Sequence, residues 1–318
     1  MKNKTLNVLS IDFDFFQVVE ETIMREHYPD GVDLPTELSI FTWSSHYANK
    51  NCEQLIRNVS INETRLNELL SILSNNNAKE PKVLIANSHK HIYDFIIENF
   101  NESKTTKLNL VNIDMHHDMF NENPELDCGN WVKHITKTIK NYSLTWIANP
   151  ISLSAYNLDE NEFNMVKYDF ENIKDTDFDL IFLCRSDTWT PPHLDSYFHN
   201  IVTHIAAIYD NVLIENQVAK PRDFEDYVTQ LKKTYEEMEK WRNHCMRASI
   251  TNGNGATCDL CHKSLKPFEI YRLIGQTTIP GKNYHKMTSD TTTKTHHKYH
   301  LCQNCYNKVI TAIDLKSI

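Results

Sequence analysis

The sequence is poor in glycine and lacks the glycine-rich motifs that bind nucleotide phosphates. Only 6 of its 318 residues are glycine, and neither G-x-G-x-x-G nor G-x-x-x-x-G-K-[ST] occurs. Both motifs need glycine where the backbone approaches a phosphate. We therefore expect no phosphate-binding loop.

Long apolar runs and an excess of positive charge are also absent. No stretch approaches the roughly 20 apolar residues of a membrane-spanning helix, so we expect no membrane partner. Asp12 and Asp14 interrupt the N-terminal apolar run, which a signal peptide would not tolerate. The formal net charge of −9 argues against nucleic acid as a partner. We expect a cytoplasmic protein, and the length predicts about two domains.

Half of the eight cysteines form two C-x-x-C pairs, Cys258/Cys261 and Cys302/Cys305. Two thiolates two residues apart can bind one tetrahedral zinc ion, and such pairs are typical of structural zinc sites in intracellular proteins. FEIYRLIG between the pairs suggests a hairpin, and CQNCYNKVITAI suggests a helix. The pattern resembles a treble-clef or zinc-ribbon module, and we predict one structural Zn²⁺ held by four cysteines.

A change in composition near residue 250 predicts the domain boundary. Residues 222–248 contain no Gly or Pro and have a helical composition, whereas TNGNGAT at 251–257 is rich in turn formers. We predict a main domain over 1–220, a linker helix over 221–250 and the zinc-binding domain over 251–318.

Within 1–220, strand patterns alternate with helical patterns. Apolar runs typical of parallel strands buried on both faces occur at 6–12, 82–88, 108–114, 143–149 and 178–184. Helical patterns lie at 60–73, 88–100 and 192–210, with Ser60 and Glu63 spaced as a capping box. The alternation predicts an α/β fold with a doubly wound, mostly parallel sheet. Its ligands should bind beyond the carboxyl ends of the strands.

Acidic residues and histidines follow four of these predicted strands. They are Asp12 and Asp14 after the first, His89 after the second, Asp114, His116 and Asp118 after the third, and Asp187 after the fifth. In a parallel sheet these ends meet at one edge, where several carboxylates repel one another unless cations neutralise them. Two divalent ions would balance Asp12, Asp14, Asp114 and Asp118.

This donor set of carboxylates and two imidazoles suits Mn²⁺, with Fe²⁺, Co²⁺ or Zn²⁺ as alternatives. Two such ions can lower the pKa of a shared water. Each motif also has a structural alternative: acidic residues cap helices, and a lone histidine packs or caps. The D-x-H-x-D at 114–118 is the most specific, because three ligand-type side chains directly after a buried strand have few structural reasons to occur together.

The motifs resemble those of the binuclear manganese hydrolases of the arginase (ureohydrolase) superfamily. The matching residues are His89, the D-x-H-x-D at 114–118 and the D-x-D at 12–14. DFDFF, GNWV (129–132) and SDTWTPPH (186–193) look most like the arginase-like branch called UPF0489, which includes peptide arginases. The resemblance covers about the first 210 residues. In arginases the D-x-D follows the D-x-H-x-D, whereas here it comes first; a circular permutation of the fold would explain this order.

The resemblance implies a hydrolase that converts arginine residues of a peptide substrate to ornithine and urea with two Mn²⁺ ions. Asp114 and Asp12 would bridge the ions, with His89 and Asp118 on one and His116 and Asp14 on the other. Asp118 would also carry a proton to the leaving amine.

Three further residues are candidates for binding or catalysis. Asp187 would pair with the substrate guanidinium or replace a missing metal ligand, Asn130 would orient the substrate backbone, and His117 would shuttle protons. Each has a structural alternative, as a helix cap, a turn residue and a packing residue respectively.

Two other functions are compatible with the sequence. One is a one-zinc deacetylase or amidohydrolase, which would bind a single catalytic ion. The other is an inactive arginase-like body whose zinc domain binds peptide or nucleic acid. In an active enzyme the zinc domain would be structural or would dock the peptide substrate.

Overall fold

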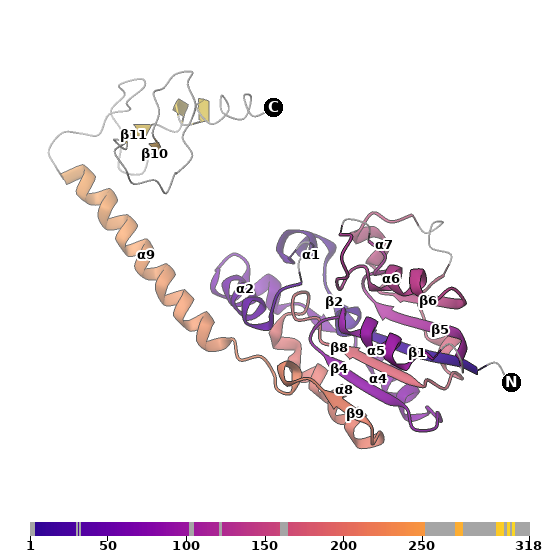
Figure 1. Ribbon diagram of the computed structural model, residues 1–318. Coiled ribbons are helices and arrows are strands. Elements are labelled where there is room, and N and C mark those ends of the chain that lie inside the picture. The colour runs from indigo at the N-terminus through magenta and orange to yellow at the C-terminus, as the bar shows by residue number, and fades with distance from the viewer. Residues whose placement is uncertain are drawn as a thin grey trace. The chain divides into compact units, whose positions relative to one another are not determined.

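A seven-stranded parallel sheet organises the first part of the chain (Figure 1). In this computed structural model the strand order is β7-β6-β5-β1-β8-β4-β9, and every neighbouring pair is parallel. The strands are β1 (Lys4–Asp12), β4 (Lys82–Ala86), β5 (Thr105–Asp114), β6 (Tyr142–Ala148), β7 (Val166–Lys167), β8 (Leu180–Cys184) and β9 (Val212–Ile214). The predicted α/β class and parallel sheet are confirmed, and each of the five expected strands is present.

Helices pack on both faces of this sheet. One core contains residues of α4 (Glu63–Ser74) and α8 (Asp195–Ile208), and the other contains residues of α5 (His91–Asn99) and α6 (Trp131–Thr138). Successive side chains of β1 alternate between them: Leu9 and Ile11 enter the first core, and Leu6 and Val8 enter the second. Burial on both faces is the reason that the strands read as nearly continuous apolar runs.

Shorter elements surround this framework. They are η1 (Phe13–Phe16), β2 (Gln17–Val18), α1 (Glu21–His27), α2 (Thr36–Ala48), α3 (Glu53–Arg57), β3 (Ser60–Ile61), α7 (Ser152–Ala155), η3 (Glu171–Ile173), η4 (Pro192–Leu194) and η5 (Asn216–Val218). Trp43 and Tyr47 of α2 share a third core with Ile23 of α1 and with Met115, which directly follows β5. These helices therefore pack near the carboxyl end of the sheet.

The capping box expected at Ser60 is wrong. Ser60 lies in β3, and α4 begins at Glu63 with Asn62 as its cap. The Asn62 side-chain oxygen accepts a hydrogen bond from the Arg65 backbone N–H at 3.1 Å. Asparagine and serine are both favoured helix caps. Because Ser60 pairs with Val18 in a strand, Asn62 caps the helix instead.

The structure describes residues 4–29, 31, 33–101, 105–120, 123–159, 165–251, 271–275, 297–301, 304–305 and 307–308. The chain divides into two units, Met1–Lys232 and Lys233–Ile318, called here the first and second units. The division falls within α9 (Glu225–Thr251), which covers most of the linker helix predicted over 221–250.

In the second unit, β10 (Tyr271–Gly275) pairs antiparallel with β11 (His297–Leu301). The first of these strands lies in the segment where we expected a hairpin. Of the predicted zinc ligands, Cys258, Cys261 and Cys302 lie outside the described residues, and Cys305 is half-buried. Within the part of the chain that is described, no helix has both the length and the apolar composition needed to cross a membrane.

Candidate metal centre

Adjacent strands bring the predicted ligand motifs to one edge of the sheet. β1 lies between β5 and β8, with β4 next to β8. Ile11 pairs with Ile113, so Asp12 and Asp114 end neighbouring strands at the same level. His89 follows β4 in the turn that leads into α5. β1 thus occupies the centre of the sheet. The D-x-D and the D-x-H-x-D therefore lie side by side, although they are far apart in the sequence.

Asp12, His89 and Asp114 form a first group of potential ligand atoms, all within 4.8 Å of one another. His89 Nδ1 lies 3.2 Å from an oxygen of Asp12, 3.2 Å from Asp114 Oδ2 and 3.1 Å from an oxygen of Asp118. One imidazole nitrogen carries at most one proton and cannot donate to three carboxylates at once. Asp12, His89 and Asp114 therefore lie together in the manner of ligands around a cation, and Asp118, which is in neither ligand group, approaches them through His89.

Asp14, Asp114 and His116 form a second group with the same 4.8 Å limit. His116 Nδ1 lies 3.1 Å from Asp14 Oδ2 and 3.5 Å from Asp114 Oδ1. Asp14 Oδ2 is fully buried and makes no hydrogen bond of good geometry, in spite of the nearby imidazole. Asp114 belongs to both groups, with Oδ2 toward His89 and Oδ1 toward His116. Asp12, which we also expected to bridge, belongs to the first group only.

Polar side chains behind the ligands fix their orientation. The Ser10 hydroxyl lies 2.6 Å from His89 Nε2, and the Tyr156 hydroxyl lies 2.7 Å from His116 Nε2. Metal-binding histidines are commonly oriented in this way through their second ring nitrogen. Both histidines therefore present Nδ1 to the carboxylates. Ser10 precedes Asp12 by two residues on the same face of β1, a spacing that sequence reasoning overlooked.

Asp118 is held by a strained backbone and a tryptophan. Its φ of +53° lies in the left-handed region that non-glycine residues rarely adopt. The Trp131 indole N–H donates to Asp118 Oδ2 at 2.5 Å. Backbone strain of this kind is concentrated at functional sites, and here it directs a carboxylate toward His89.

Burial governs the electrostatics of the centre. Burial and the Asp12 carboxylate raise the pKa of Asp14 well above its ordinary value. Burial and the Asp114 carboxylate raise the pKa of Asp118 to about 8. Burial lowers the pKa of His89, but the Asp118 carboxylate and its neighbours outweigh this effect and raise it well above the usual range. Raised pKa values favour the protonated forms of these three side chains, and divalent cations would displace the protons on binding.

Asp187 does not join the other predicted ligands. Its oxygens accept hydrogen bonds from Arg185 Nε at 2.5 Å and Arg185 Nη2 at 3.0 Å, and from the Thr36 hydroxyl at 2.6 Å. Arg185 is fully buried. The carboxylate thus already holds a guanidinium, one that belongs to the protein itself, and the structure places it in a structural ion pair.

Asn130 and His117 lie in the loop after β5 but outside both ligand groups. The Asn130 amide donates to two backbone carbonyls of its own loop, at 2.7 and 3.0 Å, and accepts from the Asp127 N–H at 2.9 Å. This matches its alternative role as a turn residue. His117 Nδ1 accepts from the Met119 N–H at 2.9 Å, and its ring packs on Phe120 with centroids 4.2 Å apart.

A further carboxylate, Asp33, lies close to the centre without belonging to any sequence motif. It accepts a short hydrogen bond from the hydroxyl of Ser88, the residue before His89. Burial, Asp33 and Asp118 all raise the pKa of the Cys128 thiol. Asp33 and Asp118 therefore both lie within electrostatic range of the Cys128 thiol.

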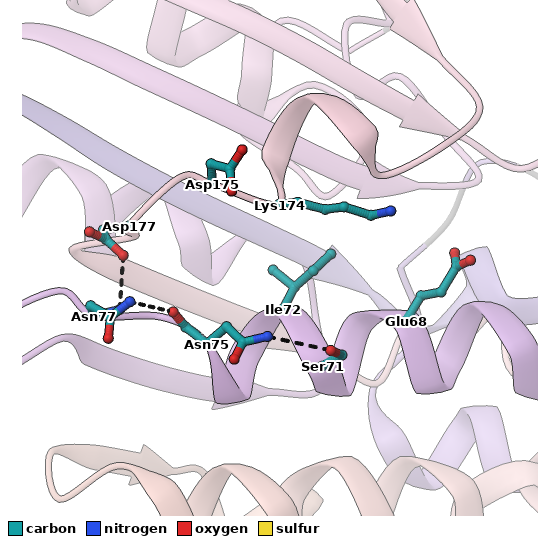
Figure 2. Close-up of a pocket in the computed structure, with 8 residues that line it drawn as sticks. All are labelled: Glu68, Ser71, Ile72, Asn75, Asn77, Lys174, Asp175 and Asp177. Atoms are coloured by element: carbon teal, nitrogen blue, oxygen red, sulfur yellow. Dashed lines mark hydrogen bonds between the residues drawn. The ribbon is translucent and has the colours of Figure 1, made fainter.

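The cavity drawn in Figure 2 lies elsewhere. It is formed by the end of α4 and the turn before β8, where the Asn77 N–H donates to Asp177 Oδ1 at 2.8 Å. These residues stand at the amino ends of β4 and β8, at the edge opposite to the acidic centre. Its lining residues include no histidine or cysteine, so we do not assign it to the chemistry of the acidic centre.

Comparisons with protein-family models, with curated proteins and with solved structures each gave no match. The function of the centre must therefore be inferred from its own residues.

Proposed function

We propose that the first unit binds two divalent cations and hydrolyses the guanidinium group of an arginine residue in a peptide. The ligands would be Asp12, Asp14, His89, Asp114, His116 and Asp118. The observation that carries this proposal is the presence of Asp114 in both ligand groups, one oxygen toward each histidine. A shared carboxylate favours two ions over the single ion of a deacetylase.

The donor types support manganese in particular. Carboxylates outnumber imidazoles by four to two, and hard oxygen donors with some imidazole suit Mn²⁺. Two ions, when bound, supply a nucleophilic water at neutral pH. A preformed nucleophile is needed because a guanidinium is stabilised by resonance and is a poor electrophile.

The protein's own side chains would hold the reaction partners in place. Ser10 and Tyr156 keep the two imidazoles oriented, and Trp131 keeps Asp118 facing the first ligand group. Asp118 is our candidate to carry a proton to the leaving amine, because its carboxyl group lies beside the first ligand group, 3.1 Å from His89 Nδ1.

Charge supports a cationic substrate. Two divalent ions would neutralise the four ligand carboxylates, and Asp33, bonded to the residue before His89, is a further carboxylate near them. A carboxylate can bind a guanidinium through two parallel hydrogen bonds. With Asp187 already paired to Arg185, we assign to Asp33 the role of binding the substrate guanidinium.

Elemental analysis combined with a urea-release assay on arginyl peptides tests the proposal. The full-length protein should bind two manganese ions per chain and release urea. Asp14→Asn should lose one ion and the activity, whereas the exposed Asp94→Asn should lose neither. A single bound ion would favour a one-metal deacetylase. Two bound ions without urea release from any arginyl peptide would support the metal centre but reject the hydrolysis of guanidinium.

A further inference from the structure

A third group of potential ligand side chains lies in the first unit and shares no residue with the acidic centre. Potential ligand atoms of His27, His46 and Cys52 all lie within 4.8 Å of one another. His27 ends α1, His46 lies in the last turn of α2, and Cys52 directly precedes α3. Three separate elements therefore present one ligand-type side chain each to the same place.

The chemistry of this group differs from that of the acidic centre. It contains no carboxylate. A thiolate with two imidazoles is a softer donor set, which favours zinc over manganese. Cys52 is buried and both histidines are half-buried, so an ion between them would be largely shielded from water. The two imidazole rings have their centroids 5.8 Å apart and are steeply inclined to each other.

Only a small adjustment would bring the three atoms into bonding range. Zinc binds sulfur at about 2.3 Å and nitrogen at about 2.0 Å, so tetrahedral ligand atoms stand roughly 3.5 Å apart. The present spacing is at most 4.8 Å, so side-chain displacements on the order of 1 Å would reach this geometry. We propose that His27, His46 and Cys52 bind one zinc ion, with water as the fourth ligand, and that this ion fastens α1, α2 and the start of α3 together.

The position of this site links it to the acidic centre. The ion would join the two ends of the segment from His27 to His46, which contains Asp33. Within that segment the Pro29 carbonyl accepts a hydrogen bond from the Trp189 indole at 3.1 Å. The Trp189 ring in turn lies 5.6 Å from that of His116. A zinc ion here would fix the segment that carries Asp33 and packs behind a ligand of the acidic centre.

Zinc content of the full-length protein tests this inference. His46→Ala and Cys52→Ser should each contain one zinc ion fewer per chain than the wild type. The matched controls His204→Ala, on α8, and Cys184→Ala, a buried thiol outside every ligand group, should keep the wild-type zinc content. Equal zinc contents in all five proteins would overturn the proposal.

A second measurement covers the case in which the variants fail to fold. Anomalous diffraction at the zinc absorption edge, on wild-type crystals grown with zinc, should show a peak between His27, His46 and Cys52. Peaks confined to the acidic centre or to the C-x-x-C cysteines would reject the site. Because neither measurement uses activity, the result does not depend on the proposed hydrolysis.

Discussion

Replacement of Asp114 by asparagine should abolish binding of both ions at the acidic centre. Asp114 supplies one oxygen to each ligand group, and an amide in its place removes a negative charge from both. Asp14→Asn removes a ligand from the second group only. The two substitutions are alike in size and chemistry, so they differ chiefly in how many ions each should affect.

The expected effect on thermal stability follows from linkage. A ligand at 100 times its Kd stabilises the folded state by about 2.7 kcal/mol. For a unit the size of Met1–Lys232, each kcal/mol raises Tm by about 2–4 °C. One ion should therefore raise Tm by about 5–11 °C, and two independent ions by about twice as much.

Calorimetric unfolding of the full-length protein, with and without Mn²⁺, measures this difference. The Tm shift should be complete in the wild type and in Asp94→Asn, about halved in Asp14→Asn and absent in Asp114→Asn. Comparing shifts, and not absolute Tm values, removes any effect of the substitutions on the metal-free protein. A shift in Asp114→Asn equal to that in Asp14→Asn would refute the sharing of this carboxylate between two ions.

Three further outcomes are expected. Asp187→Asn should destabilise the first unit by about 3–5 kcal/mol in urea unfolding, while manganese content stays unchanged, because it removes the bidentate carboxylate partner of the buried Arg185 and leaves Asp195, at 3.6 Å, as its charged partner. Burial raises the pKa of Asp187, but nearby arginines outweigh this and lower it from the ordinary 3.8. The stability that Asp187 contributes should therefore be present above about pH 4 and lost as the pH falls below it; a variant with the same acid sensitivity as the wild type would contradict this. Tyr156→Phe removes the hydroxyl that orients His116 and should weaken manganese binding by about 10–100-fold in titration calorimetry, and unchanged affinity would exclude that role. Asp33→Asn should raise KM for an arginyl peptide more than it lowers kcat, whereas a loss in kcat alone would argue against substrate binding.

The strands and the acidic centre could be predicted because both depend on local patterns. Buried parallel strands have to be apolar on both faces, and their ends place the D-x-D and the D-x-H-x-D at one edge wherever they occur in the chain. β7 and β9 have only two and three residues, which is too short to give a pattern. They are defined by pairing with their neighbours.

The partners of individual side chains could not be predicted in the same way. Asp187 follows a strand as the true cluster residues do, and only the packed structure shows that Arg185 occupies both its oxygens. Asp33 and Tyr156 lie in segments without a motif, and tertiary packing brings Tyr156 to His116 and Asp33 to Ser88. Asn130 has the composition of a turn residue, and its hydrogen bonds agree with that simpler interpretation.

The central position of β1 also determines when the acidic centre can form during protein synthesis. Val8 pairs with Leu110 on one side and with Leu180 on the other, so the N-terminal strand has no complete set of neighbours until β8 has left the ribosome. Contacts this distant in sequence form slowly. Until then, β4 and the His89 that follows it have no strand to join them to β1, and the proposed binding of metal would be complete only late in the maturation of the first unit.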